Sequence, residues 1–587
     1  MRLDQPEGAP DTGIRWGSDI AAEMLRRLGC EYVSLNPGAS YRGLHDSIVN
    51  HLGNERPGIL LCLHEDHSVA IAHGYARVTG HPMACVLHAN VGLLHGMMAV
   101  FNAWCDRAPL LVLGATGPLA SEKRRPWIDW IHTMRDQGGL VRNFVKWDDQ
   151  PSSPESLVES MTRAWLLTRS QPAGPVYVCL DAGLQEAKLE REPDWPDLAR
   201  FQPPSPPRPA PSDIARAADM LARAERPLIL FGRGSRDTPA WQARIRLAEK
   251  LGACVMTDLK TGAMFPTSHP AHVVPPFNAL TRSAREVVAE ADCLLSLDWA
   301  DLGGALKQAG NLRSGPKIIA ASLDRHLHRG AGMEYQALAP ADIYFDSGSD
   351  AVVDELLRAP GAGSKPPWKQ RIAGAAAKSD GRSITLHQIA AALRGNFDNP
   401  EQVTFSLLNR GWPIEVWPFT QALSYLGKDG GGGLGSGPGL SVGAALALQK
   451  LGRYAVSVLG DGDFCMGATA LWTAVHHRIP LLILIDNNRS YFNDELHQET
   501  VARARGRNEN NRWIGLRLED PPPDIAMLAR AQGAVGIGPV TTSNEVPKAI
   551  SEGVGVLKSG GVCIIDFHVD PGADRRSAAS VGQRKTG

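Results

Sequence analysis

One pattern repeats three times along the 587 residues of the chain: apolar residues at helical spacing alternate with short, wholly apolar strands. In the first repeat, residues 20–28 have helical spacing, residues 32–35 form an expected strand, and a helical stretch follows Glu65 and runs to Gly80. Strands that are apolar on both faces are typical of parallel sheets covered by helices on both sides. The sequence therefore predicts an α/β protein with three doubly wound parallel-sheet domains.

Proline-rich stretches separate the three repeats. We expect linkers at residues 186–211 and 359–383, between a first domain at 1–185, a middle domain at 212–358 and a third domain at 384–571. The small, polar residues 572–587 predict a frayed tail. The remaining expected strands are 83–87, 109–113, 227–231, 293–297, 454–459 and 481–485, and an expected helix covers about 92–105.

The charge balance excludes some classes of partner. With 61 basic against 62 acidic residues, the chain has no field of one sign to attract nucleic acid or a membrane surface, which favours a small-molecule partner. The nine scattered cysteines include no C-x-x-C pair, which argues against a disulfide framework and a structural zinc site. No signal-like start or long apolar stretch is present, so we expect a cytoplasmic protein.

The most informative motif is Gly460-Asp461-Gly462, followed after 24 residues by Asn487-Asn488. Each part ends an apolar strand, and ligands of open α/β sheets bind at such strand ends. The glycines let the backbone approach a phosphate, and a helix expected to begin near Met466 would offer its amide groups to negative charge. A carboxylate and an amide oxygen are ligands that suit Mg²⁺.

This motif resembles the cofactor motif of thiamine-diphosphate enzymes of the benzoylformate decarboxylase, acetolactate synthase and pyruvate decarboxylase type. The resemblance implies that Asp461 and the Asn488 side chain bind Mg²⁺, with the Ser490 carbonyl as third ligand. It also implies a pyrimidine-binding first domain and a diphosphate-binding third domain. The residues expected to contact thiamine diphosphate in the third domain are Gly435, Ser436, Gly460, Asp461, Gly462, Asp463 and Asn488.

A second match lies about 400 residues earlier, at Glu65 and the segment that ends at Gly80. It resembles the family segment that begins with the glutamate contacting the aminopyrimidine ring. A carboxyl group that shares its proton with a ring nitrogen favours the imino tautomer, which can remove the proton from the thiazolium carbon and leave a nucleophilic ylide. Glu65 is therefore the expected activating residue and one of the residues that contact the cofactor.

Residues 87–89, 101–104 and 108–112 resemble benzoylformate decarboxylase more than acetolactate synthase, and a histidine of that enzyme handles protons at the position of His88. An imidazole of near-neutral pKa can give and take a proton around pH 7, so His88 is our first candidate for proton transfer. His64, His67, His95 and His132 are secondary candidates. The expected substrate pocket comprises Ala39, Ser40, Tyr41, His88 and His132.

Several positions depart from the family pattern. The large apolar residue that supports the bent cofactor falls at either Leu434 or Ser436. Ala39 replaces a serine of benzoylformate decarboxylase, Thr116 replaces a frequent glutamine, and Phe492 stands where glycine is common. Because such positions face the substrate in relatives, benzoylformate, pyruvate or acetolactate cannot be assigned from the sequence.

Two further patterns have alternative interpretations. The arginines at 503–507, with Arg512 and Arg517, suit either a solvated basic face, which we favour, or a site for a substrate carboxylate. The Gly232-Arg233-Gly234 pattern of the middle domain admits FAD, which some relatives bind, but it is a lone short glycine pattern that an ordinary turn at a strand end explains adequately.

The leading functional hypothesis is a thiamine-diphosphate-dependent 2-keto acid decarboxylase or carboligase acting through the ylide and an enamine. The runner-up is a carbon–carbon lyase that cleaves a 2-hydroxy ketone, a diketone or a 2-hydroxyacyl thioester. A third alternative, a homologue that binds the cofactor without turnover, is disfavoured by the presence of Glu65 and the whole metal motif. The resemblance also implies a homodimer or homotetramer with active sites shared between subunits.

Overall fold

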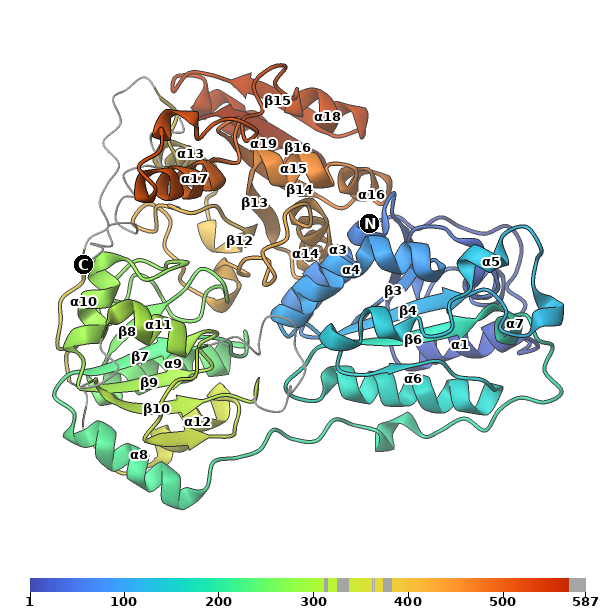
Figure 1. Cartoon of the computed structure of the whole chain (residues 1–587), viewed down its shortest axis with the longest axis horizontal. Coiled ribbons are helices and arrows are strands. Elements are labelled where there is room, and N and C mark those ends of the chain that lie inside the picture. Colours follow the sequence, from blue (N-terminus) through green and yellow to red (C-terminus); the bar gives the residue numbers. More distant parts are fainter. Residues whose placement is uncertain (311–314, 325–336, 362, 364, 373–382, 570–587) are drawn as a thin grey trace.

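The computed structural model describes residues 1–310, 315–324, 337–361, 363, 365–372 and 383–569 (Figure 1). The expected tail at 572–587 and part of the expected linker at 359–383 lie outside the described residues. Within the described residues, every helix is too short or too polar to cross a lipid bilayer.

Three separate sheets carry the fold, and all of their strand pairs run parallel. The first has the order β2-β1-β3-β4-β6-β5, the second β11-β10-β9-β7-β8 and the third β12-β13-β14-β16-β15. The strands of the first sheet are β1 (Tyr32–Leu35), β2 (Gly58–Leu61), β3 (Met83–Leu87), β4 (Leu110–Thr116), β5 (Asp148–Asp149) and β6 (Pro175–Asp181). The predicted fold class is confirmed.

The second sheet contains β7 (Pro227–Phe231), β8 (Cys254–Thr257), β9 (Cys293–Leu297), β10 (Lys317–Ala321) and β11 (Ile343–Phe345). The third contains β12 (Val403–Leu407), β13 (Tyr454–Gly460), β14 (Leu481–Asn487), β15 (Val535–Val540) and β16 (Val562–His568). The expected strands at 32–35, 83–87, 227–231 and 293–297 coincide with β1, β3, β7 and β9. By contrast, the helix expected near Met466 is wrong in its start, because α15 (Asp461–Gly467) begins directly at the end of β13.

Helices cover both faces of the first and third sheets. In the first, α1 (Gly17–Arg27) and α6 (Pro154–Arg169) pack on one face, and α3 (Glu65–Thr79) and α4 (Ala89–Cys105) pack on the other. In the third, α13 (Leu386–Gly395) and α19 (Val546–Lys558) lie opposite α14 (Gly437–Lys450), α16 (Ala470–His476) and α18 (Ile525–Ala531). Alternate residues of each strand enter opposite cores, so the strands read as continuous apolar runs.

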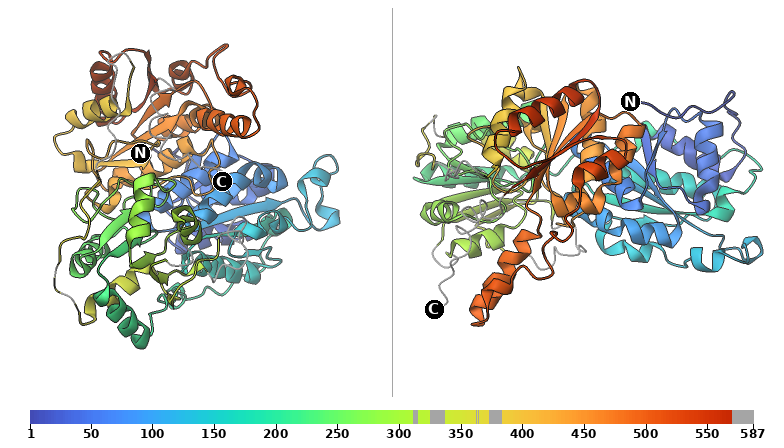
Figure 2. Two further views of the ribbon diagram at one scale, coloured as in Figure 1. Left: turned by 60° about the vertical axis from the view of Figure 1, so that its left-hand side comes forward. Right: turned by 90° about the horizontal axis from the view of Figure 1, so that it is seen from above.

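The middle domain carries α8 (Pro211–Arg223), α9 (Thr238–Leu251), α10 (Arg282–Glu290), α11 (Leu302–Ala309) and α12 (Ser349–Arg358). It contacts the first domain through an ion pair of Arg107 with Asp324 at 2.9 Å, and the third through a backbone hydrogen bond from Ala263 to Tyr425 at 2.9 Å. The three domains therefore meet one another, as Figures 1 and 2 show.

Helices α3 and α14 pack at unusually short range, and their contact merges the first and third domains into one hydrophobic core. A Cβ atom added to Gly74 would lie 2.1 Å from the Leu440 carbonyl oxygen, and one added to Gly443 would lie 1.9 Å from the Ile71 carbonyl oxygen. Only glycine fits at these two positions. The contact brings the start of α3, which carries Glu65, beside the start of α14 and its glycine-rich loop.

We expect Gly443→Ala to lower the free energy of unfolding by about 1–3 kcal/mol, because the methyl group must push two helix backbones apart. The matched control is Gly555→Ala in α19, where an added Cβ meets nothing within 4 Å. There the substitution should stabilise the protein by up to about 1 kcal/mol through helix propensity. Denaturant unfolding of both variants measures the difference, and equal stabilities would contradict the close contact.

Candidate active site

Asp461 and Asn488 stand at the ends of the neighbouring strands β13 and β14. The Asp461 Oδ2 and Asn488 Oδ1 atoms accept hydrogen bonds from the same Ser490 amide, at 3.1 and 2.9 Å. Two oxygen ligands from separate strands thus converge on one point at the sheet edge. The structure thus brings together the side chains of Asp461 and Asn488 and the backbone of Ser490, the three residues that we expect to hold the metal.

The Asp461 side chain is only 4% exposed, and no cationic side chain is among the groups that shift its pKa. Burial raises its pKa to about 6, and backbone amides oppose this shift without cancelling it. A buried carboxylate without a cation is unfavourable when ionised, and a divalent cation would supply the missing charge. The donor set, one carboxylate and one amide oxygen, fits Mg²⁺.

The glycine-rich loop before α14 is held by Asp463, whose Oδ1 accepts the Gly435 amide at 2.6 Å and the Gly437 amide at 3.4 Å. The exposure of the side chains in this loop distinguishes between Leu434 and Ser436, the two candidates for support of the cofactor. Ser436 is 2% exposed, and its hydroxyl bonds Asn102 and Asp66, whereas Leu434 is 48% exposed. The free apolar side chain in this loop is that of Leu434.

The two glycines around Asp461 differ in their surroundings. A Cβ added to Gly460 meets nothing within 4 Å, so this strand end leaves open space in front of its backbone. A Cβ added to Gly462 would lie 2.5 Å from the Tyr491 ring, which covers the first turn of α15. The open backbone at Gly460 suits the close approach of a ligand.

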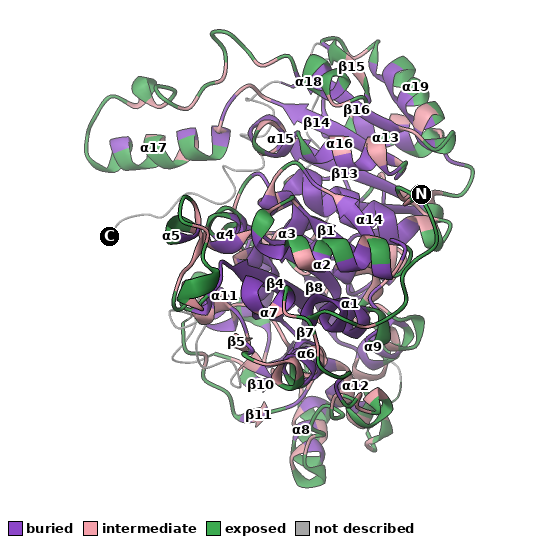
Figure 3. Ribbon diagram, turned by 90° about the vertical axis from the view of Figure 1, so that its right-hand side faces the viewer, coloured by how far each residue is buried: buried purple, intermediate pink, exposed green. Residues whose placement is uncertain are grey.

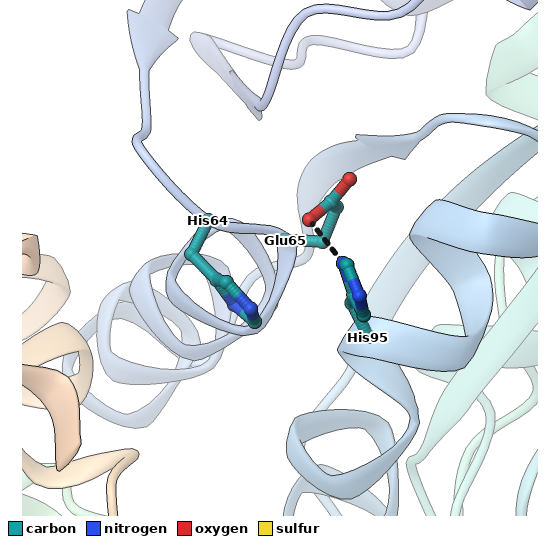
Figure 4. Close-up of side chains that lie close together, drawn as sticks. All are labelled: His64, Glu65 and His95. Atoms are coloured by element: carbon teal, nitrogen blue, oxygen red, sulfur yellow. Dashed lines mark hydrogen bonds and ion pairs between the residues drawn. The ribbon is translucent and has the colours of Figure 1, made fainter.

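Glu65 is the first residue of α3 and contacts His95 of α4, with 3.1 Å between Glu65 Oε2 and His95 Nδ1 (Figure 4). The His95 ring stacks on His64 with 5.1 Å between ring centroids. Ligand atoms of these three residues lie within 4.8 Å of one another, as in a metal site. However, His64 Nδ1 accepts the Asp66 amide, which places the ring proton on Nε2 and so favours a hydrogen-bonded cluster over metal binding.

His88 caps α4, and its Nδ1 lies 2.8 Å from the Ser40 hydroxyl. Its ring also meets the His132 ring edge-on at a centroid distance of 4.6 Å. A Cβ added to Gly38 would lie 2.3 Å from the His88 side chain, so a glycine in the first loop makes room for the imidazole. The structure thus gathers Ser40, His88 and His132, with Ala39 and Tyr41 adjacent in the chain.

Two contacts at these sites were not foreseen from the sequence motifs. His95, only a secondary candidate, is the direct partner of Glu65. Glu495 is buried and bonds the Ser490 hydroxyl at 2.7 Å. Arg512 and Arg517 pair with Glu495. Arg512 is half-buried, whereas Arg503, Arg505, Arg507 and Arg517 are exposed, as the solvated basic face that we favoured requires. The spacing of Glu495, Glu499 and Arg503 at four-residue intervals was the available signal in the sequence.

Comparison with known proteins identifies the family. Three family models match: the thiamine pyrophosphate enzyme N-terminal binding domain at residues 15–140, the central domain at 214–325 and the C-terminal binding domain at 409–567. The chain therefore belongs to the thiamine pyrophosphate enzymes, and both of the cofactor-binding domains of that family are present.

Individual relatives are distant but match over most of their length. The chain is 24% identical over 581 residues to the probable acetolactate synthase large subunit of Methanocaldococcus jannaschii, covering 94% of this chain and 92% of the relative. It is 27% identical over 492 residues to benzoylformate decarboxylase of Pseudomonas aeruginosa, covering 80% of this chain and 85% of the relative. The fold matches a 4-hydroxybenzoylformate decarboxylase of Rhodococcus jostii RHA1 with a TM-score of 0.76 at 22% identity, over 94% of this chain and 99% of that chain.

Burial lowers the pKa of His88 to about 4, and positive charge at His132 contributes. Since the ordinary histidine pKa is 6.5, the unfolded chain takes up this proton first as the pH falls. Stability that His88 contributes above pH 6.5 should be lost toward pH 4. Between pH 6.5 and pH 4, the melting temperature of His88→Gln should therefore fall less than that of wild type. The exposed His81, changed to Gln, is the control, and parallel pH profiles for wild type and His88→Gln would contradict the assignment.

Proposed function

We propose that the chain is a thiamine-diphosphate- and Mg²⁺-dependent 2-keto acid decarboxylase or carboligase. The observation that carries the proposal is the convergence of Asp461 and Asn488 oxygens at the end of the third sheet, in a chain that also places Glu65 at the start of α3. The family membership and the decarboxylase and acetolactate synthase relatives support this reaction class. Carbon dioxide release from a panel of 2-keto acids distinguishes it from a lyase that cleaves hydroxy ketones.

In this proposal, Asp461, Asn488 and the Ser490 carbonyl would hold Mg²⁺, and Leu434 would support the cofactor. Thiamine diphosphate, when bound, supplies the nucleophilic carbon and the electron sink for cleavage beside a carbonyl. Glu65 shares its proton with the aminopyrimidine ring, and its contact with His95 fixes the orientation of the carboxyl group.

His88 is the proposed residue for proton transfer at the reacting carbon. Burial lowers its pKa to about 4, so the imidazole is neutral at pH 7 and binds a proton more weakly than the near-neutral imidazole expected from the sequence. Ser40, at 2.8 Å from Nδ1, orients the ring. We leave FAD out of the proposal, because Arg233 forms ion pairs with Asp298 at 3.1 Å and Asp324 at 2.5 Å beside the turn that follows β7.

We also propose that a second copy of the chain completes the site. Exposed apolar side chains lie on α4 and on the glycine-rich loop, where Gly433 adjoins Met98 and Gly435 adjoins Met466. The exposed apolar residues of this surface are Leu63, Val91, Leu94, Met98, Leu434 and Met466. Such a patch beside Glu65 and the loop suits a subunit interface that also encloses a cofactor.

Isothermal titration of metal-stripped protein with thiamine diphosphate tests the cofactor assignment. We expect wild type to show saturable binding that requires Mg²⁺. The Asp461→Asn variant should either not bind thiamine diphosphate or bind it without a dependence on Mg²⁺. The melting temperature of that cofactor-free variant should not fall at pH 7, since a buried ionised carboxylate is removed. The exposed Asp398, changed to Asn, should bind as wild type does. No binding by wild type would overturn the proposed function.

Mixing two inactive variants tests activation and the shared site together. Glu65→Gln should bind the cofactor without turnover, and Asp461→Asn should fail to hold it. If each site combines Glu65 of one subunit with Asp461 of another, random exchange between dimers restores about a quarter of wild-type activity, because half of the dimers then contain one intact site. Activity in Glu65→Gln alone would contradict the mechanism, and no restoration after confirmed exchange would contradict the shared site.

A further inference from the structure

An arm of the third domain projects from the body of the molecule directly after residues 488–490. We call these residues the metal loop, because the proposed function assigns Asn488 and Ser490 to Mg²⁺. It comprises α17 (Phe492–Ala504) and the segment that returns to Leu518, and Figure 3 shows α17 standing away from the packed sheets. The buried side chains of α17 are only those of Phe492, Glu495 and Ala502. Little apolar packing therefore holds the helix in place.

The two ends of the arm are joined at its base, beside the metal loop. The Tyr491 amide donates to the Leu516 carbonyl at 3.0 Å, and the Leu518 amide donates to the Arg489 carbonyl at 2.8 Å. An antiparallel bridge links Ser490 with Arg517. The returning segment thus pairs with the same three residues, 489–491, that follow Asn488.

The metal loop is strained at this point. Arg489, between Asn488 and Ser490, has φ of +55°, a left-handed conformation that a residue with a side chain adopts at a cost of about 1 kcal/mol or more. Its amide donates to the Asn487 side chain at 3.0 Å, and its carbonyl accepts from Leu518. The conformation that aligns Asn488 and Ser490 therefore depends on contacts made by the arm.

Glu495 is the charged residue at the root of the arm, and its side chain is 1% exposed. Its Oε1 accepts the Ser490 hydroxyl at 2.7 Å and Arg517 Nε at 3.1 Å, and its Oε2 accepts Arg512 Nε at 3.2 Å. A buried carboxylate with these three donors fixes both strands of the arm base to the serine that also contacts Asp461 and Asn488.

We propose that Glu495, with Arg512 and Arg517, is a positioning residue that couples the docked base of the arm to Mg²⁺ and cofactor binding through Ser490. The inference rests on the proposed function, because Glu495, Arg512 and Arg517 would act on the proposed Mg²⁺ site through Ser490 without binding the metal themselves. Groups that orient metal ligands from behind typically change metal affinity by about 10–100-fold when they are removed. The coupling must also act in reverse, so that ligand binding stabilises the contacts at the base of the arm.

The first test measures thiamine diphosphate binding by titration calorimetry over a series of Mg²⁺ concentrations. Glu495→Gln should raise the half-saturating Mg²⁺ concentration about tenfold or more, and excess Mg²⁺ should restore binding, which a merely unfolded variant would not allow. Ser490→Ala should give a similar shift, and the double variant should add little to either single change because both break one contact. The control is Glu509→Gln, which loses an ion pair of the same arm with Arg503 and should bind as wild type does.

The second test follows trypsin cleavage at the exposed arginines 505 and 507 of the arm. Saturating thiamine diphosphate and Mg²⁺ should slow cleavage of the wild-type arm and protect Glu495→Gln much less. Unchanged Mg²⁺ dependence in both Glu495→Gln and Ser490→Ala, equal shifts in Glu509→Gln, or equal protection of the arm would overturn the coupling. Failure of wild type to bind the cofactor would instead overturn the proposed function itself.

Discussion

The close contact between α3 and α14 is the interaction on which the rest of the structure depends. Gly74 and Gly443 let the two backbones approach so closely that the cores of the first and third domains become one. The contact also fixes the start of α3 relative to the glycine-rich loop before α14. Asp66, next to Glu65, lies 3.3 Å from the Ser436 hydroxyl of this loop. Apolar burial between these helices therefore stabilises the fold and sets the relation between the two cofactor-binding domains.

Polar groups at the candidate site are held by buried charge and hydrogen bonds rather than by apolar packing. Asp461 is buried and forms no ion pair with a cationic side chain among the described residues, whereas Glu495 has two arginines and a serine hydroxyl. The first arrangement favours binding of an added cation, and the second favours a rigid loop behind it. Both interactions meet at Ser490, whose amide and hydroxyl point to different carboxylates.

Much of the fold could be predicted because buried parallel strands leave a local pattern. The strands at 32–35 and 83–87 coincide with β1 and β3, and the helix from Glu65 ends before Gly80 as its left-handed cap requires. The start of α15 could not be predicted, because Asp461-Gly462-Asp463 has low helix propensity and enters the helix only through its place at the strand end. The sequence named His95 only as a secondary candidate and did not single out Glu495, because a single sequence does not reveal which side chains meet across elements.

The sequence by itself determined the α/β class with three parallel sheets and the strand-end motif that carries Asp461 and Asn488, since apolar periodicity and glycine spacing are local properties. The tertiary structure alone decided that Leu434 is exposed while Ser436 is buried, that His95 contacts Glu65, and that Glu495 reaches Ser490. These relations depend on helix packing and on the return path of the arm, which join residues from different elements. Burial and pairing of charge follow from that packing, and no local pattern encodes them.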